Sequence, residues 1–246
     1  MTALFALTWI DVKLSLRNFL ATFFTLAFPA LMLFLFGGMY GNAPNPMFGS
    51  YGSMDVSIPG YIAALVIGST AFMSLPIELA GRREKGVLRR FRATPLSPVS
   101  VLASQVLVNL LFCVLGTVIL LVAGSLAWQV RLPAHPLPLV AAFLLCCMSL
   151  YSLGFLIASL VRSMKAVLAV SMAVFYPMMF LSGGTIPLQF MPRVVQDISL
   201  FLPMTWAVRL LKDLWFDAGW NLTAVAVLVG VLAVCTLSAV RFFKWE

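Results

Sequence analysis

Long apolar runs separated by short polar stretches make up most of this chain. A helix needs about 20 apolar residues to cross the hydrocarbon core of a membrane, and runs of about 18 or more recur here. Lipid offers the backbone no hydrogen-bonding partner, so each run is predicted to be a helix. None alternates apolar and polar residues as transmembrane strands do, which excludes a transmembrane barrel. The six predicted spans are residues 19–39, 58–79, 99–128, 139–161, 166–181 and 222–240.

The segment before the first span, residues 1–18, has a moderately amphipathic pattern. Phe5 and Trp9 share one helical stripe, while Asp11 and Ser15 lie on a neighbouring one. This spacing predicts a short interfacial helix at the membrane surface. The helix is either a brace for a cytoplasmic partner or a plain juxtamembrane anchor. An acidic residue in the leader and the lack of a small-residue cleavage site argue against a cleavable signal peptide.

The stretch between the fifth and sixth spans, residues 182–220, is apolar but is divided by Pro187, Pro192 and Pro203. Charged residues recur in it four positions apart, at Arg193 and Asp197 and at Arg209 and Asp213. Two short amphipathic helices, forming a re-entrant hairpin on the outer side, fit this pattern. The alternative is a seventh span, which would place the C-terminus outside. The predicted fold is therefore an all-α integral membrane protein, with residues 1–246 forming one transmembrane domain.

Composition agrees with a membrane protein, because 62% of the residues are hydrophobic and only 10% are charged. A soluble domain has roughly 25% charged residues. The net charge is +8, and Lys and Arg mark the cytoplasmic segments of membrane proteins. With the N-terminus inside, 12 of the 16 basic residues lie on inner segments and 4 on outer ones. This bias predicts that both termini are cytoplasmic, and no nucleic-acid partner is expected.

The chain lacks the side chains that several classes of membrane protein need. Glu78, at the inner end of the second span, is the ionisable residue nearest to a span centre, which argues against an ion-coupled carrier. No hydrolase constellation and no P-loop is present, so energy for transport must come from another subunit. His135 stands alone in a loop. The four cysteines, Cys113, Cys146, Cys147 and Cys235, fall in apolar runs and indicate packing, with no metal site and no cofactor in this chain.

The densest group of basic residues, six of the 16, lies between the second and third spans in residues 81–98. Within this loop Val87, Leu88 and Phe91 fall on one helical face, with arginines around the rest. An apolar ridge with basic flanks fits a groove on another protein. The alternative is that the arginines hold anionic lipid headgroups.

This loop resembles a signature of the ABC-2 type permease family, the membrane subunits of ATP-binding-cassette exporters. Residues 83–97 read REKGVLRRFRATPLS, with the Gly, Leu and Pro-Leu-Ser positions of that signature. Residues 181–188, 191–192 and 202–205 resemble the family's Ser-Gly, Pro and Pro-Met-Thr elements around the outer end of the fifth span. The resemblance covers the whole chain and is nearest to compact drug exporters, such as daunorubicin resistance permeases and nodulation-factor exporters. One departure is Arg89, where many relatives have Glu.

The resemblance implies a permease subunit of a multidrug or antibiotic exporter in the bacterial inner membrane. It implies two permease copies, as a homodimer or with a sister permease, in contact with membrane lipids. Two cytoplasmic ABC ATPases per complex would bind ATP and Mg, and residues 87–94 would be the coupling helix. The residues expected to couple to the ATPase are Arg83, Glu84, Gly86, Val87, Leu88, Arg90, Phe91 and Pro95. The residues expected to line the substrate pathway are Tyr61, Ser69, Met73, Met172, Phe175, Tyr176 and Met179. The outer gate is expected at Ser182, Gly183 and Gly184.

Two other functions remain open from the sequence. One is export of a lipid or a lipid-linked polysaccharide by the same kind of complex. The other is a non-transporting membrane scaffold or receptor subunit. The expected pathway residues could equally be ordinary helix-packing or lipid-facing residues.

Overall fold

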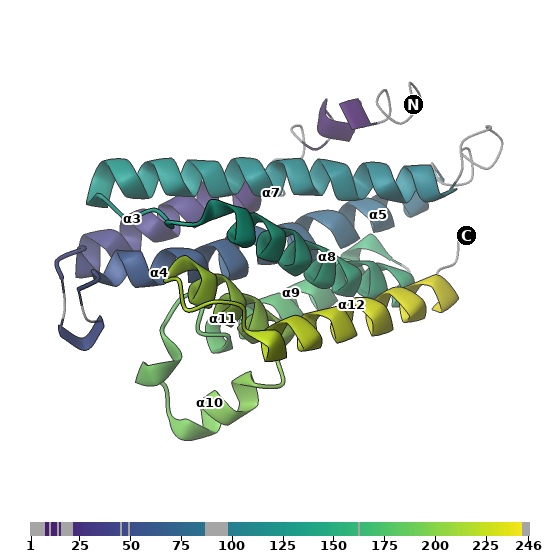
Figure 1. The fold of residues 1–246 in the computed structure, drawn as a ribbon. Coiled ribbons are helices and arrows are strands. Elements are labelled where there is room, and N and C mark those ends of the chain that lie inside the picture. Colours follow the sequence, from purple (N-terminus) through teal and green to yellow (C-terminus); the bar gives the residue numbers. More distant parts are fainter. Residues whose placement is uncertain are drawn as a thin grey trace.

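The computed structural model describes residues 8–9, 11–13, 15, 22–44, 46–48, 50–86, 98–161 and 163–242. Within these ranges the chain is helical and contains no β-strand. Six helices are long and apolar enough to cross a membrane, and a bent pair of shorter helices accompanies them. The predicted all-α membrane fold with six spans is therefore confirmed. Figure 1 shows the long helices lying side by side along one common direction.

The six long helices follow the predicted order. The first starts as a π-helical turn, Phe23–Ala27, and continues as α3, Phe28–Tyr40; the others are Ser53–Glu84, α7 Pro98–Trp128, α8 Pro136–Leu160, α9 Met164–Leu181 and α12 Leu222–Phe242. The second consists of α4 (Ser53–Tyr61), π-helical turns at Ile62–Ile67 and Thr70–Ser74, and α5 (Leu75–Glu84). We call the whole of Ser53–Glu84 the central helix, because the other elements surround it.

Burial identifies the central helix as the core of the molecule. In its most apolar stretch 94% of the residues are buried, against 22% in the first and last long helices. Small residues let neighbours approach it closely. A Cβ placed on Gly60 would lie 2.5 Å from the Gly184 carbonyl oxygen, and one on Gly68 would lie 2.8 Å from the Phe175 ring. The central helix therefore packs against the turn that follows α9 and against α9 itself at Phe175.

The central helix starts five residues before its predicted beginning because two polar side chains cap it. Asn42 Oδ1 accepts hydrogen bonds from the backbone N–H groups of Met54, at 3.0 Å, and Asp55, at 3.1 Å. The Asp55 carboxylate accepts from the N–H groups of Gly52, at 3.0 Å, and Arg131, at 2.9 Å. The first N–H groups of a helix have no partner inside it, so these acceptors extend the helix beyond its apolar run.

The stretch between α9 and α12 forms the two short helices that its pattern predicts. A 3₁₀ turn at Leu188–Phe190 is followed by α10 (Arg193–Ser199) and α11 (Pro203–Trp215), which meet at 93°. In Figure 1 α10 projects from the bundle, whereas α11 lies against it. The buried face of α11 packs on α4, α8 and α12. Neither pair of charges four positions apart forms an ion pair in this described segment: Arg209 instead lies 5.0 Å from the Trp206 ring.

The bundle has two ends, which we name after residues that lie there. The Glu84 end contains the end of α5, the start of α7 and the turn between α8 and α9. The Trp128 end contains the loop from α3 to α4, the end of α7 and the segment that follows α9. In Figure 1 the Glu84 end is on the right and the Trp128 end on the left. The two ends place the candidate coupling residues and the candidate gate residues far apart.

Candidate functional site

The last turn of α5 holds the turn between α8 and α9 from both sides. Arg83 Nη1 donates a hydrogen bond to the Ala158 carbonyl oxygen at 3.0 Å, and Nη2 donates to the Val161 carbonyl oxygen. Glu84 Oε1 accepts from the Met164 N–H at 2.6 Å. A cation thus meets the carbonyl end of α8, and a carboxylate meets the amide end of α9, as the helix dipoles favour. We call this pair of contacts the α5 clasp.

Beside the clasp, α5 forms a buried ion pair with the N-terminal segment. Arg82 Nη2 lies 3.0 Å from Asp11 Oδ1, and the two side chains are only 14% and 3% exposed. The other carboxylate oxygen of Asp11 accepts hydrogen bonds from Ser104, at 2.6 Å, and Gln105, at 3.3 Å. The N-terminal polar stripe therefore faces the protein, while Trp9 on the apolar stripe is 57% exposed. This ion pair joins three parts of the chain: the N-terminal segment, α5 and α7.

A second polar contact lies one turn deeper. Glu78 Oε1 accepts a hydrogen bond from the Ser15 hydroxyl at 2.8 Å. Asn109 of α7 donates to the Gln105 carbonyl oxygen at 2.9 Å. Among the described residues, side-chain oxygens of Glu78, Gln105 and Asn109 are buried without a partner. Such a layer is uncommon in a membrane protein, where buried polar groups are usually paired.

Three of the eight predicted coupling residues are described. Arg83 and Glu84 bind the chain's own α8–α9 turn through the α5 clasp. Gly86 ends α5 in the left-handed region, at φ +67°, and its N–H donates to the Arg83 carbonyl oxygen at 3.0 Å. Glycine is favoured there because a side chain would strain this conformation. The other predicted coupling residues, Val87, Leu88, Arg90, Phe91 and Pro95, lie outside the described residues.

The predicted pathway residues lie on the central helix and on α9, which contact each other inside one chain. Five are buried in the core: Tyr61, Ser69, Met73, Phe175 and Met179. Met172 and Tyr176 are partly buried. The Phe175 ring lies 6.0 Å from the Phe72 ring and 5.5 Å from the Tyr176 ring. A pathway along these residues stays a prediction, and it requires the central helix and α9 to separate.

The predicted gate residues make a tight turn against the central helix at the Trp128 end. Ser182 is fully buried, and Gly183 has a φ of +77°. A Cβ on Gly184 would lie 2.4 Å from the Ala64 Cβ, so no side chain fits without displacement. Lys212 of α11 donates to the Gly183 carbonyl oxygen at 3.2 Å. The turn is therefore held between the central helix and α11.

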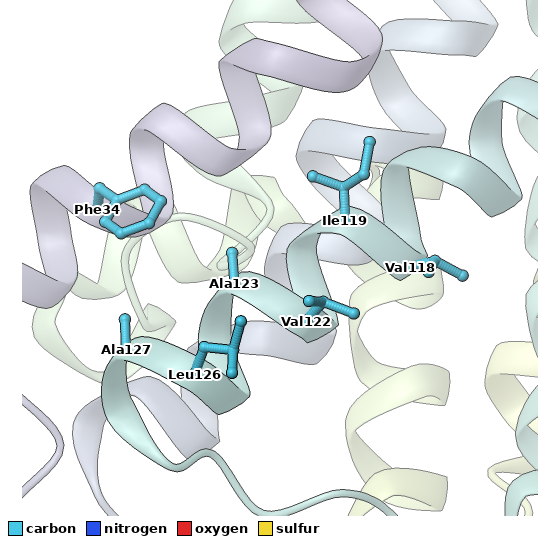
Figure 2. Close-up of a pocket in the computed structure, with 7 residues that line it drawn as sticks. All are labelled: Phe34, Val118, Ile119, Val122, Ala123, Leu126 and Ala127. Carbon is cyan, nitrogen blue, oxygen red and sulfur yellow. The ribbon is translucent and has the colours of Figure 1, made fainter.

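An apolar groove runs between α3 and α7, and no pattern in the sequence predicts it. Its volume is about 600 Å³, and Figure 2 shows Phe34 of α3 across from Ala123 and Ala127 of α7. The remaining lining residues are Val118, Ile119, Val122 and Leu126. Several of them are largely exposed, so this face would contact lipid chains. None of the predicted pathway residues lines it.

A second cavity, of about 420 Å³, lies at the Trp128 end and has charged as well as apolar walls. Arg209, Lys212 and Asp213 of α11 supply its charges. Lys212 lies outside the six long helices, and its partial burial lowers its pKa to about 8. The sequence feature that points to this cavity is the group of charged residues within the apolar segment 182–220. Within the described part of the chain, no three His, Cys, Asp or Glu side chains come together as metal ligands.

The chain is similar to several proteins that are named as permeases. The chain is 26% identical over 204 residues to a transport permease, ycf38, from Porphyra purpurea, an alignment covering 79% of this chain and 67% of that protein. It is 28% identical to the inner membrane transport permease YhhJ of Escherichia coli, covering 78% of this chain and 53% of that protein. It is 27% identical to the daunorubicin resistance ABC transporter permease DrrB1 of Streptomyces coeruleorubidus, covering 88% and 76%.

The family comparison spans nearly the whole described bundle. The model of the ABC-2 type transporter family matches residues 2–216, which include five of the six long helices and the α10–α11 pair. The relatives and the six-helix fold agree with this match. The chain therefore belongs to the ABC-2 type transporter family of multi-pass membrane permease subunits, which work with ATPase subunits in ABC transporters.

Proposed function

We propose that this protein is the membrane subunit of an exporter that moves a hydrophobic or amphipathic small molecule out of the bacterial cell. The observation that carries the proposal is the way α5 ends. The buried central helix runs from the Trp128 end to Glu84. Its last turn binds the N-terminal segment and the turn between α8 and α9, and the chain then continues through Gly86 into the basic loop, residues 81–98. A partner that moves this loop would act directly on the core of the permease.

The proposed partner is a cytoplasmic ABC ATPase that binds ATP and Mg. The apolar ridge of Val87, Leu88 and Phe91 would enter a groove on the ATPase, with Arg90 and the other arginines around it. Arg83 and Glu84 would not contact the ATPase in this scheme. They would instead pass displacement of the loop to the α8–α9 turn, because both are bound to that turn.

The proposed complex has two permease copies and two ATPases in the inner membrane, with both termini in the cytoplasm. The distribution of Lys and Arg supports this orientation, since the basic loop and both ends of the chain then share one side. The Trp128 end would be the outer end. The gate turn at Ser182, Gly183 and Gly184 would then separate the pathway from the outside.

The proposed cargo is drug-like. The central helix and α9 offer Tyr61, Met73, Phe175 and Met179, which are apolar or aromatic with few polar groups. Such a surface suits a hydrophobic or amphipathic molecule. A relative named for daunorubicin resistance lends support to this class of cargo. Because these residues are buried, transport would need the two helices to move apart.

Docking can be tested by co-expressing the permease with a candidate ATPase and purifying the complex. We expect Phe91→Asp, and deletion of residues 87–94, to abolish recovery of the ATPase, because both remove the apolar ridge. Phe201→Asp is the matched control, since Phe201 is 86% exposed and lies in the segment at the other end of the bundle. The permease alone should hydrolyse no ATP. Full recovery of the ATPase with the deletion variant would refute the proposal.

Cargo can be tested in cells that express the permease with its ATPase. We expect survival against a panel of hydrophobic drugs to rise with the wild-type pair and to return to background with Phe91→Asp. Unchanged survival against every drug, together with a complex that still forms, would leave the ATPase partnership intact and refute the drug cargo.

A further inference from the structure

The cavity of about 420 Å³ at the Trp128 end lies where four separate parts of the chain meet. The 3₁₀ turn Pro46–Phe48, the start of the central helix, the segment after α9 and one face of α11 form its walls. Phe48, Leu188 and Phe216 supply apolar surface, and each is partly buried. The cavity thus combines an apolar wall with the charged face of α11.

The charges on that face are not balanced. Arg209 and Lys212 are three residues apart, so they project from the same side of α11. Lys212 donates one of its three N–H groups to the Gly183 carbonyl oxygen. Arg209 stacks on Trp206 and forms no ion pair within this described segment. Asp213 is the one carboxylate in the lining, and its Oδ2 accepts from Asn221 at 2.8 Å.

This arrangement has unused capacity for an anion. Two cations face one carboxylate, which is already hydrogen-bonded, and among the described residues both cations have N–H donors without a hydrogen-bond partner. Charge-assisted hydrogen bonds from Arg or Lys to phosphate, sulfonate or carboxylate are the strong ones in proteins. An inorganic anion would use the cations but leave the apolar wall uncovered. A ligand with both an anionic group and an apolar body would cover both.

We propose that this cavity binds an amphipathic anion, whose acidic group contacts Lys212 and Arg209 and whose apolar part lies against Phe48, Leu188 and Phe216. An anionic phospholipid and a free organic acid share this chemistry. Binding needs neither an ATPase nor transport, so it goes beyond the proposed export function and can be tested on the permease alone.

The first test titrates the permease, purified in a neutral detergent, with decanesulfonate, using calorimetry. Decanol serves as the uncharged analogue. We expect decanesulfonate to saturate one site per chain and decanol to give no saturable signal. Lys212→Met and Arg209→Gln should each weaken binding by about tenfold or more. Arg193→Gln is the matched control, because Arg193 is an exposed arginine on the neighbouring helix and lies outside the cavity; its affinity should be unchanged.

A second readout depends on pH and does not rely on removing the side chain. Decanesulfonate keeps a single charge from about pH 7 to about pH 9.5. Lys212, whose pKa is lowered to about 8, loses its charge over that range. The other charged groups of the lining are Arg209 and Asp213, and the remaining described residues of the lining carry no titratable side chain. Wild-type affinity should therefore fall by about tenfold between these pH values, while Lys212→Arg should hold its affinity.

A separate experiment with lipids distinguishes a membrane lipid from a free organic acid as the bound anion. The permease is reconstituted in nanodiscs of phosphatidylglycerol mixed with phosphatidylcholine, and lipids retained on the protein are counted by mass spectrometry. Enrichment of phosphatidylglycerol that Lys212→Met removes identifies a membrane lipid as the occupant. Binding of decanesulfonate without such enrichment identifies a free organic acid. Absence of both, or equal binding by wild type and Lys212→Met, overturns the proposal.

Discussion

The buried ion pair between Arg82 and Asp11 gives the sharpest quantitative prediction. Both side chains are largely buried, at 14% and 3% exposure. Removing one partner of a buried pair costs about 3–5 kcal/mol, because the other charge is left without compensation. Asp11 keeps its hydrogen bonds from Ser104 and Gln105, so Arg82→Met should lie near the lower limit, at about 3 kcal/mol.

Replacing Asp11 instead of Arg82 should lower the free energy of unfolding by less. Asp11→Asn keeps an oxygen that can accept from Ser104 and Arg82, and Arg82 is the more exposed of the two side chains. We expect a loss of about 1–2 kcal/mol in the free energy of unfolding. The double variant Arg82→Met with Asp11→Asn contains no isolated charge. Its loss should therefore be smaller than the sum of the single losses by about 2 kcal/mol.

The measurement is a double-mutant cycle on equilibrium unfolding in mixed micelles. Lys85→Met is the control, because Lys85 is an exposed cation at the same helix end, and its removal should change stability by less than about 0.5 kcal/mol. Additivity of the two single variants within about 0.5 kcal/mol would show that the pair is not coupled. A loss for Arg82→Met no greater than for Lys85→Met would contradict the reasoning directly.

Three further predictions concern the Trp128 end. Asp55→Ala should lower stability by about 2–3 kcal/mol, because it strands the N–H groups of Gly52 and Arg131. Asp197→Ala, at an exposed site on α10, should have little effect in the same unfolding assay. Gly184→Ala should cost about 1–3 kcal/mol through its clash with Ala64, while Gly230→Ala, where a Cβ meets open space, should not destabilise; equal thermal stability of the two variants would contradict the close approach. Lys212 binds its proton less tightly in the folded protein, so the unfolded chain holds more protons between about pH 8 and its ordinary pKa of 10.5. Wild-type stability should therefore rise with pH across this window relative to Lys212→Met, and parallel melting curves for the two would refute the lowered pKa.

The sequence was sufficient for the six long helices because a continuous apolar run has one stable form in lipid. It was insufficient for their ends. The central helix continues to Ser53 and Glu84 because Asn42 and Asp55 cap one end and α8 and α9 hold the other. These contacts join residues that are far apart in the chain, so no local sequence pattern predicts them.

The candidate site shows the same limit. Asp11 was visible as a lone acid beside an apolar run, but its partner Arg82 belongs to another helix. Side-chain type and the family resemblance predict the pathway residues. Within a membrane span, however, nearly every residue is apolar, so composition cannot separate a core position such as Phe175 from a lipid-facing one such as Val118. That separation depends on which helix is central.

The position of the central helix connects the two ends of the molecule. At one end its last turn is bound to the N-terminal segment and to the α8–α9 turn; near the other, Gly60 lies against Gly184 without room for a side chain. Close-packed interiors transmit displacement instead of absorbing it. A force on the loop after Gly86 would therefore reach the predicted gate turn at residues 182–184 through a single helix. Lys212 holds that same turn from α11, so an anion bound at Lys212 would act on the opposite side of the same contact.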